Sequence, residues 1–154
     1  MSNSRPVATT LLNRRTLLIG SLGLGGAAAA YWYNIGASVE GTALSVHAAY
    51  LGARNGDFTL IDIRRPDEWA RTGVPDGAVP LDMRDPDFTR KMLDLVPDKS
   101  APVALICARG VRSRGLANRM QELGFTNVID VPEGMLGSGA GPGWIASGLP
   151  VTKL

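Results

Sequence analysis

The sequence predicts an α/β fold with a central parallel sheet flanked by helices on both faces, preceded by an apolar N-terminal segment. Short apolar runs that suit buried strands alternate with segments of helical periodicity, which is typical of a parallel sheet covered on both faces. The chain has 154 residues, of which 45% are hydrophobic and 19% charged, so one globular domain is expected. Residues 17–37 differ from the rest because they carry no charge and are rich in glycine and alanine.

The N-terminal segment, residues 1–37, is interpreted as a signal peptide or a membrane anchor. Arg14 and Arg15 precede the uncharged stretch, which as a helix would be roughly 31 Å long, enough to span a bilayer. The arginine pair resembles a twin-arginine export signal, but any positive flank before a hydrophobic segment looks similar. Ala27–Ala30 offers cleavage sites, whereas the aromatic residues at 31–33 suit an interfacial anchor; a buried core helix is a third interpretation. In a bacterium, a signal or an anchor would place residues 38–154 in the periplasm, associated with the membrane if the segment is retained.

The helices predicted for residues 38–154 have recognisable ends. Ser45 is a candidate N-cap, and Pro66 suits the first turn of a helix. The predicted helices span residues 46–54, 67–71, 85–95 and 113–123, with glycines at 56, 73 and 124 after the first, second and fourth. The predicted strands span residues 58–63, 78–81, 102–107 and 127–131, and residues 36–43 are interpreted as a linker. In the helix over 85–95, Phe88, Met92 and Leu95 are expected on one face.

Composition excludes several classes of site. Three arginines and no acidic residue precede Glu40, which leaves 13 basic and 14 acidic residues for the rest of the chain. The part that folds is therefore close to neutral, and no nucleic-acid-binding surface is indicated. Cys107 is the only cysteine and His47 the only histidine, so an internal disulfide, a cysteine-based metal cluster and a serine–histidine triad all lack their parts.

Cys107 is the candidate nucleophile. It ends the predicted strand over 102–107, and the residues up to Arg112 form a turn into the next helix. Gly110 permits a tight turn, and the backbone N–H groups at a helix start converge on one spot that favours an anion. Such a spot stabilises the thiolate form of a cysteine. Arg112 and its neighbouring arginines also indicate an anion, because cations at a helix N-terminus otherwise oppose the helix dipole. Inert core packing of a lone cysteine is the alternative.

Three stretches of the chain carry a family resemblance. They read LIDIRRPDEWARTGVPDGAVPLD from residue 60, CARGVRS from residue 107 and EGMLGSGAGPGWIASGLPV from residue 133. Cys107, Gly110, Arg112 and Ser113 match the loop pattern C-x-x-G-x-R-S. With these stretches in the same order, residues 40–152 resemble the rhodanese (sulfurtransferase) family in its single-domain form. The resemblance implies a rhodanese-like domain over residues 38–154.

The resemblance also implies a reaction and a site. Cys107 would attack a small sulfur-containing anion such as thiosulfate, become a persulfide and pass the sulfur to a thiol or to cyanide. Backbone amides of the loop would cradle the sulfur, Arg112 would brace the loop, and Arg109 would bind the anionic end of the donor. The candidate substrate-binding residues are Ala108, Arg109, Gly110, Val111 and Arg112. No cofactor and no metal is required. A persulfide carrier without turnover, or a sensing or binding module of the rhodanese type, is the alternative.

Phosphatases and arsenate reductases are a further alternative, because they also use a cysteine loop that ends in arginine. The phosphatase loop is C-x5-R, whereas Cys107 and Arg112 here form C-x4-R. The smaller loop suits a sulfur atom better than a phosphoryl group, so this class is disfavoured.

The sequence departs from the family pattern in two places. Residues 73–78 read GVPDGA where G-H-I-P-G-A is usual, which we expect to change only local packing. Near the end, Glu133 replaces the first residue of the usual glycine pair, and GSGAGPG over 137–143 is inserted before Trp144. We expect this end segment to lie beside the Cys107 loop and to bear on substrate specificity.

Four other prominent side chains are interpreted as structural. Asp62 and Arg64 lie two positions apart at the end of the first predicted strand and could reach the same crevice, but a structural ion pair is favoured. Trp69 and Trp144 are expected to pack in the core.

Overall fold

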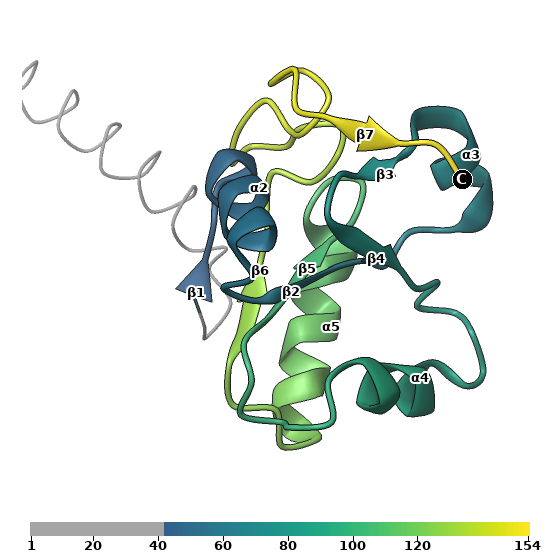
Figure 1. Cartoon of the computed structure of the whole chain (residues 1–154), viewed down its shortest axis with the longest axis vertical. Helices are drawn as coiled ribbons and strands as arrows, with labels where there is room; N and C mark the ends of the chain where they lie inside the picture. The colour runs from purple at the N-terminus through teal and green to yellow at the C-terminus, as the bar shows by residue number, and fades with distance from the viewer. Residues whose placement is uncertain (1–41) are drawn as a thin grey trace, which may run out of the picture. The chain divides into compact units, whose positions relative to one another are not determined.

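The computed structural model describes residues 42–154, so the predicted leader over residues 1–37 lies outside the described residues. Five parallel strands form the central sheet in the order β1-β6-β5-β2-β4 (Figure 1). They are β1 (Thr42–Ala43), β2 (Thr59–Asp62), β4 (Ala78–Pro80), β5 (Val103–Ile106) and β6 (Val128–Asp130). The helices are α2 (Val46–Asn55), α3 (Pro66–Thr72), α4 (Phe88–Leu95) and α5 (Val111–Glu122), and β3 (Val74–Pro75) pairs antiparallel with β7 (Val151–Thr152). The predicted α/β fold with a parallel sheet is confirmed.

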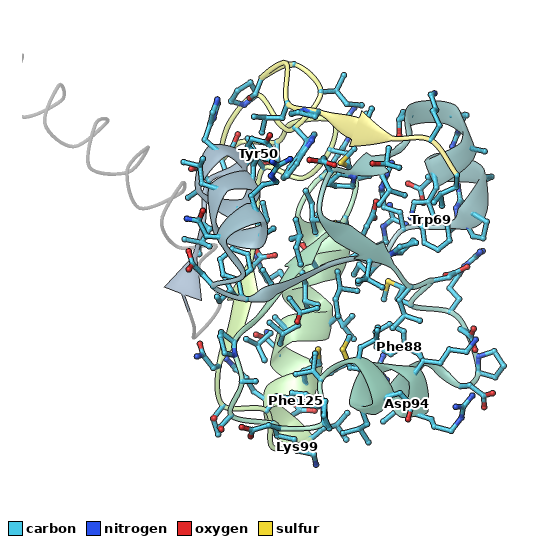
Figure 2. The ribbon with its side chains drawn as sticks, viewed as in Figure 1. Tyr50, Trp69, Phe88, Asp94, Lys99 and Phe125 are labelled. Carbon is cyan, nitrogen blue, oxygen red and sulfur yellow. The ribbon has the colours of Figure 1, made fainter. Side chains whose placement is uncertain are left out.

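Helices cover both faces of the sheet because successive strand residues point to opposite sides. Along β5, Val103 and Leu105 pack with α4 and α5, as does Cys107 just beyond the strand, whereas Ala104 and Ile106 pack with α2. Figure 2 shows side chains filling both layers, with Phe88 and Phe125 in the layer of α4 and α5. Cys107 therefore faces the helix that follows it.

On the other face, α2 and the C-terminal segment share one core. Trp144 is fully buried there, and its ring meets the Tyr50 ring edge-on with 5.9 Å between centroids. The Trp144 Nε1–H donates to the Pro150 carbonyl at 2.8 Å, which satisfies the one polar atom of its side chain. The predicted packing role of Trp144 is confirmed, and Trp69 is also buried.

The predicted helix ends agree closely with the structure in the first half of the chain. The Ser45 Oγ accepts a hydrogen bond from the Ala48 N–H at 3.3 Å, and Gly56 ends α2 with a φ of 78°. Pro66 occupies the first turn of α3, and Gly73 ends that helix. Local side-chain chemistry sets these boundaries, which is why the sequence predicts them.

Two predicted helix starts are wrong. The helix over 85–95 begins only at Phe88, because the Asp85 carboxylate accepts the Asp87 N–H at 2.8 Å and holds a turn. Leu95, expected on the inner face, is 39% exposed, and Val96 takes the interior place. The last helix starts at Val111, two residues earlier than predicted.

Three short strands were not predicted. Thr42 and Ala43, interpreted as linker, pair with β6 at the edge of the sheet, and β3 and β7 pair with each other. Strands of two residues are too short to show an alternating pattern.

Two helical glycines give a matched test of packing. A methyl group added at Gly52 in α2 would lie 2.3 Å from the Phe58 ring, whereas at Gly115 in α5 it would meet nothing within 4 Å. We expect Gly52→Ala to lower the free energy of unfolding by about 1–3 kcal/mol through overpacking. We expect Gly115→Ala to raise it by about 0.5–1 kcal/mol, because alanine favours the helix. Urea unfolding followed by circular dichroism measures both, and equal effects would contradict the close packing of Phe58 against α2.

Candidate active site

Cys107 lies at the carboxyl end of β5, between the ends of β2 and β6. Its residue is 1% exposed, and its Sγ accepts a hydrogen bond from the Gly110 N–H at 3.2 Å. Gly110 is also the N-cap of α5, so the sulfur sits at the start of that helix. A backbone donor and the positive end of a helix dipole therefore both act on Sγ, and both favour a negative charge there.

The turn from Cys107 into α5 requires glycine at position 110. Gly110 has a φ of 79°, and a Cβ built on it would lie 2.1 Å from the Pro132 carbonyl oxygen. The buried Ser113 Oγ donates to the Gly110 carbonyl at 3.2 Å and ties the turn to the first turn of α5. Gly110 and Ser113, both predicted from the loop pattern, are thus needed to shape the turn around the thiol.

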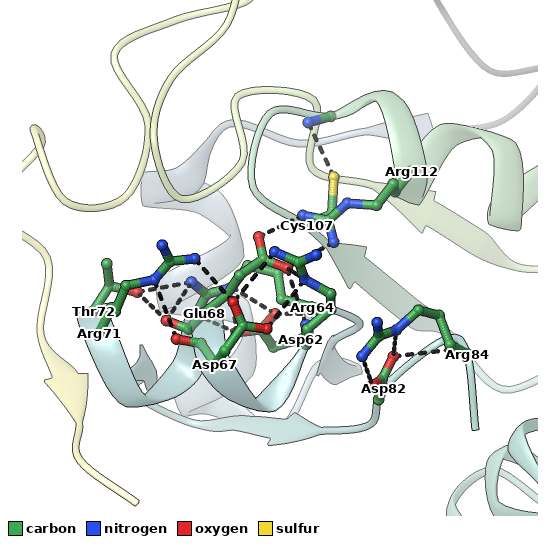
Figure 3. A network of polar contacts seen from close by, with 12 residues as sticks. Asp62, Arg64, Asp67, Glu68, Arg71, Thr72, Asp82, Arg84, Cys107 and Arg112 are labelled. Carbon is green, nitrogen blue, oxygen red and sulfur yellow. Dashed lines mark hydrogen bonds and ion pairs between the residues drawn. The ribbon is translucent and has the colours of Figure 1, made fainter.

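Arg112 forms a two-point ion pair with Glu68 of α3. Its Nη1 donates to Oε2 at 2.8 Å and its Nη2 to Oε1 at 2.7 Å (Figure 3). Hydrogen bonding to Arg112 lowers the pKa of Glu68 from its ordinary 4.5 to about 2, helped by Arg65. The pair joins α3 to the start of α5, which is the bracing role expected of Arg112.

Glu68 is the site residue that sequence reasoning missed. Its partner is 44 positions away, so no local pattern connects the two. One feature of the sequence pointed to such a partner: an arginine at the start of a helix opposes the helix dipole, and an acidic partner offsets this unfavourable interaction. The strands before α3 and α5 are neighbours in the sheet, which brings Glu68 within reach.

Asp62 and Arg64 form the predicted structural ion pair. Arg64 Nη2 lies 2.7 Å from Asp62 Oδ2, and both side chains are at most 1% exposed. Arg64 also donates to Thr72 Oγ1 at 2.7 Å and to the Gly73 carbonyl at 2.6 Å, so it ties the end of α3 to the end of β2. Burial raises the pKa of Asp62, while the hydrogen bonds and charge of Arg64 act against that rise. Arg64 Nη1 also donates to the Glu68 carbonyl at 3.4 Å, so the network holds the backbone of α3 that carries Glu68 (Figure 3).

The segment after β6 lies against the Cys107 loop, as expected from the sequence. The Met135 N–H donates to the Cys107 carbonyl and the Leu136 N–H to the Ala108 carbonyl, each at 2.9 Å. A Cβ on Gly134 would lie 2.6 Å from the carbonyl atoms of Ala108. The second glycine of the family pair is therefore retained where the two backbones touch, and the first can be Glu133 without obstructing the loop.

The candidate substrate-binding residues lie together around Cys107 but differ in exposure. Gly110 is buried, Ala108 and Arg112 are half-buried, and Arg109 and Val111 are exposed. The Val111 side chain is 76% exposed, and its backbone N–H lies in the first turn of α5. Within residues 42–154, no group of three or more histidine, cysteine, aspartate or glutamate side chains could hold a metal ion.

The Glu68–Arg112 pair makes stability depend on pH within a defined window. A carboxylate whose pKa falls on folding stabilises the protein above its ordinary pKa, and this contribution is lost as the pH falls through the folded value. For Glu68 the window runs from 4.5 down to about 2. We expect Glu68→Gln to unfold at a lower urea concentration than the wild type at neutral pH, and the gap to close as the pH falls through this window. Glu122→Gln, at the exposed end of α5, is the control; a gap that stays constant with pH would contradict the assignment.

Comparison with known proteins agrees with this geometry. The family model described as the rhodanese-like domain matches residues 45–138. The thiosulfate sulfurtransferase GlpE of Actinobacillus pleuropneumoniae serotype 3 is 34% identical over 110 residues, covering 71% of this chain and 92% of that protein. An uncharacterised protein of Rickettsia conorii is 29% identical over 107 residues, covering 62% of this chain and 84% of the relative.

A solved structure is similar over most of the chain. The polysulfide-sulfur transferase homodimer of Wolinella succinogenes superposes with a TM-score of 0.61 at 25% identity, covering 82% of this chain and 90% of the other. In the part of the chain that the structure describes, no helix is long and apolar enough to cross a membrane. The matched family, the relatives and the loop around Cys107 agree, and the chain belongs to the rhodanese-like domain family.

Proposed function

We propose that the protein is a sulfurtransferase that moves a sulfane sulfur from thiosulfate, or a similar anionic donor, to a thiol or cyanide through a persulfide on Cys107. The observation that carries the proposal is the hydrogen bond from the Gly110 N–H to Cys107 Sγ at the start of α5. A thiolate and a terminal persulfide sulfur are both anions, and this position stabilises both.

The proposed reaction has two balanced steps. The Cys107 thiolate attacks the outer sulfur of thiosulfate, the S–S bond of the donor breaks, and sulfite leaves with the electron pair. An acceptor thiolate or cyanide then attacks the outer sulfur of the persulfide and releases the Cys107 thiolate. Each step exchanges one bond to sulfur, so neither an external oxidant nor a reductant is consumed.

The two arginines of the loop have different roles in this proposal. Arg112 is committed to Glu68 and holds the loop in shape. Arg109 is exposed and forms no ion pair within residues 42–154, so its charge is available to the sulfonate end of a donor. The name of the Actinobacillus relative supports thiosulfate as a donor, and that of the Wolinella structure supports a chain of sulfane sulfurs.

Intact-mass measurement on the full chain tests the proposal. We expect thiosulfate to add one sulfur atom to the wild type, and cyanide to remove it with the appearance of thiocyanate. Cys107→Ser should gain no sulfur, because a serine hydroxyl is not ionised at neutral pH and forms no persulfide.

The other outcomes separate the alternatives. A sulfur that cyanide and thiols cannot remove would indicate a carrier or sensing module. No gain from thiosulfate or polysulfide would contradict the sulfurtransferase, and hydrolysis of a phosphate ester that depends on Cys107 would favour a phosphatase.

We also propose that residues 1–37 export or anchor the domain, so that sulfur transfer takes place in the periplasm. The support is the Arg14-Arg15 pair before the uncharged stretch. Replacing both residues by lysine keeps the positive charge but removes the guanidinium groups. We expect this variant to stay in the cytoplasm on cell fractionation; unchanged export would contradict the twin-arginine route and favour a general positive flank.

A further inference from the structure

Glu133 is a buried carboxylate that the proposed mechanism does not use. Its residue is 6% exposed, and it forms no ion pair within residues 42–154. Oε1 accepts the Val46 N–H at 3.1 Å, and Oε2 accepts the Gly143 N–H at 3.2 Å. One side chain therefore joins the start of α2 to the end of the inserted segment 137–143.

The start of α2 explains why a carboxylate is stable at this buried position. The first turn of α2 contains no acidic residue, so the positive end of its dipole is not offset locally. Glu133 supplies the negative charge from 87 positions away, while Ser45 caps a different amide. A buried carboxylate with two backbone donors and a helix N-terminus is well compensated.

The inserted segment folds back on itself around this carboxylate. The backbones of Ser138 and Gly141 hydrogen-bond to each other in both directions, and Ser138 Oγ donates to the Pro132 carbonyl at 2.7 Å. A Cβ on Gly141 would lie 2.5 Å from Glu133 Oε2, and one on Gly143 would lie 2.2 Å from the Gly137 nitrogen. Holding Gly143 in place therefore also holds Gly137 in place.

Gly137 in turn contacts the loop that carries the nucleophile. Its carbonyl accepts a hydrogen bond from Arg109 Nη1 at 3.3 Å, two residues beyond Cys107. The chain of contacts runs from the Glu133 carboxylate through Gly143 and Gly137 to the Arg109 guanidinium, with backbone atoms at every intermediate step.

We infer that Glu133 is a positioning residue for donor specificity: through the segment 137–143 it fixes the Arg109 guanidinium against the Gly137 carbonyl, and so favours doubly charged donors such as thiosulfate over singly charged ones. The inference rests on the proposed function for the role of Arg109. In this inference the two departures from the family pattern, Glu133 and the glycine-rich segment 137–143, act together to position Arg109.

Glu133→Gln is the sharpest variant for a test. A glutamine side chain has one oxygen and one NH2 group, so it can accept only one of the two backbone donors and sets its own donor against the other. Glu122→Gln makes the same change of charge at an exposed position of α5 and is the matched control. Both variants are made in the full chain.

The first measurement needs no donor. In ¹H–¹⁵N spectra we expect Glu133→Gln, but not Glu122→Gln, to shift the Arg109 Nε–H resonance, which is assigned by its loss in Arg109→Gln. Amide hydrogen exchange over 137–143 should also be faster in Glu133→Gln. An unchanged Arg109 resonance would overturn the inference even if the proposed function holds.

The second measurement is donor binding in a Cys107→Ser background, where no sulfur is transferred. We expect Glu133→Gln to weaken thiosulfate binding about tenfold, as for one weakened hydrogen bond between charged groups. We expect the same variant to weaken the binding of a singly charged alkanethiosulfonate by a smaller factor. In the double variant with Arg109→Gln, Glu133→Gln should weaken thiosulfate binding hardly further than Arg109→Gln alone does. If the two losses of binding free energy add in full, the inference is overturned.

The two proposals fail in different ways. If the wild type gains no sulfur and Cys107→Ser binds no thiosulfate, the proposed function fails, and the donor-selecting part of the inference is overturned with it. If sulfur transfer proceeds but Glu133→Gln binds thiosulfate and the alkanethiosulfonate as the control does, only the inference is overturned.

Discussion

The close contact between the Cys107–Gly110 turn and the segment 132–136 is the constraint on which the site depends. Neither backbone could approach the other with a side chain at Gly110 or Gly134, since a Cβ at either would lie within 3 Å of the opposite chain. Because β5 and β6 are neighbours in register, the residues that follow them leave the sheet side by side and can pack together. This contact sets the shape of the turn, and the Gly110 N–H and the start of α5 then act on a thiol that the turn already holds in place.

Two ion pairs with different surroundings then hold the front half of the domain to that turn. Asp62 and Arg64 are removed from solvent, and the guanidinium is surrounded by carboxylate, hydroxyl and carbonyl oxygens, which compensates its burial. Glu68 and Arg112 lie nearer the surface and connect separate helices. Removing one member of the inner pair would leave a buried charge, whereas removing one member of the outer pair would mainly release α5 from α3. The inner pair thus secures α3, and α3 presents Glu68 to the loop.

Much of the fold could be predicted from the sequence because local chemistry determines it. The runs over 58–63 and 102–107 are apolar enough to be buried on both faces, and Ser45 and Gly56 mark the ends of α2. The late start of α4 could not be predicted, because the Asp85 side chain competes with the helix for backbone donors. Cys107 and its loop could be predicted, because the residues that form them follow one another within one short stretch after an apolar run. Glu68 and the role of Glu133 could not, since their partners lie 44 and 87 positions away.

The burial of Cys107 has a consequence for damage by oxidants. The chain has no second cysteine, so a sulfenic acid formed on Cys107 could not be trapped as an internal disulfide and would stay open to irreversible sulfinic or sulfonic acid formation. With the residue only 1% exposed, the surrounding turn restricts the access of an oxidant to Sγ. Burial by the turn therefore protects Cys107 from oxidants. Reduction of a sulfenic acid on Cys107 requires a thiol from another molecule.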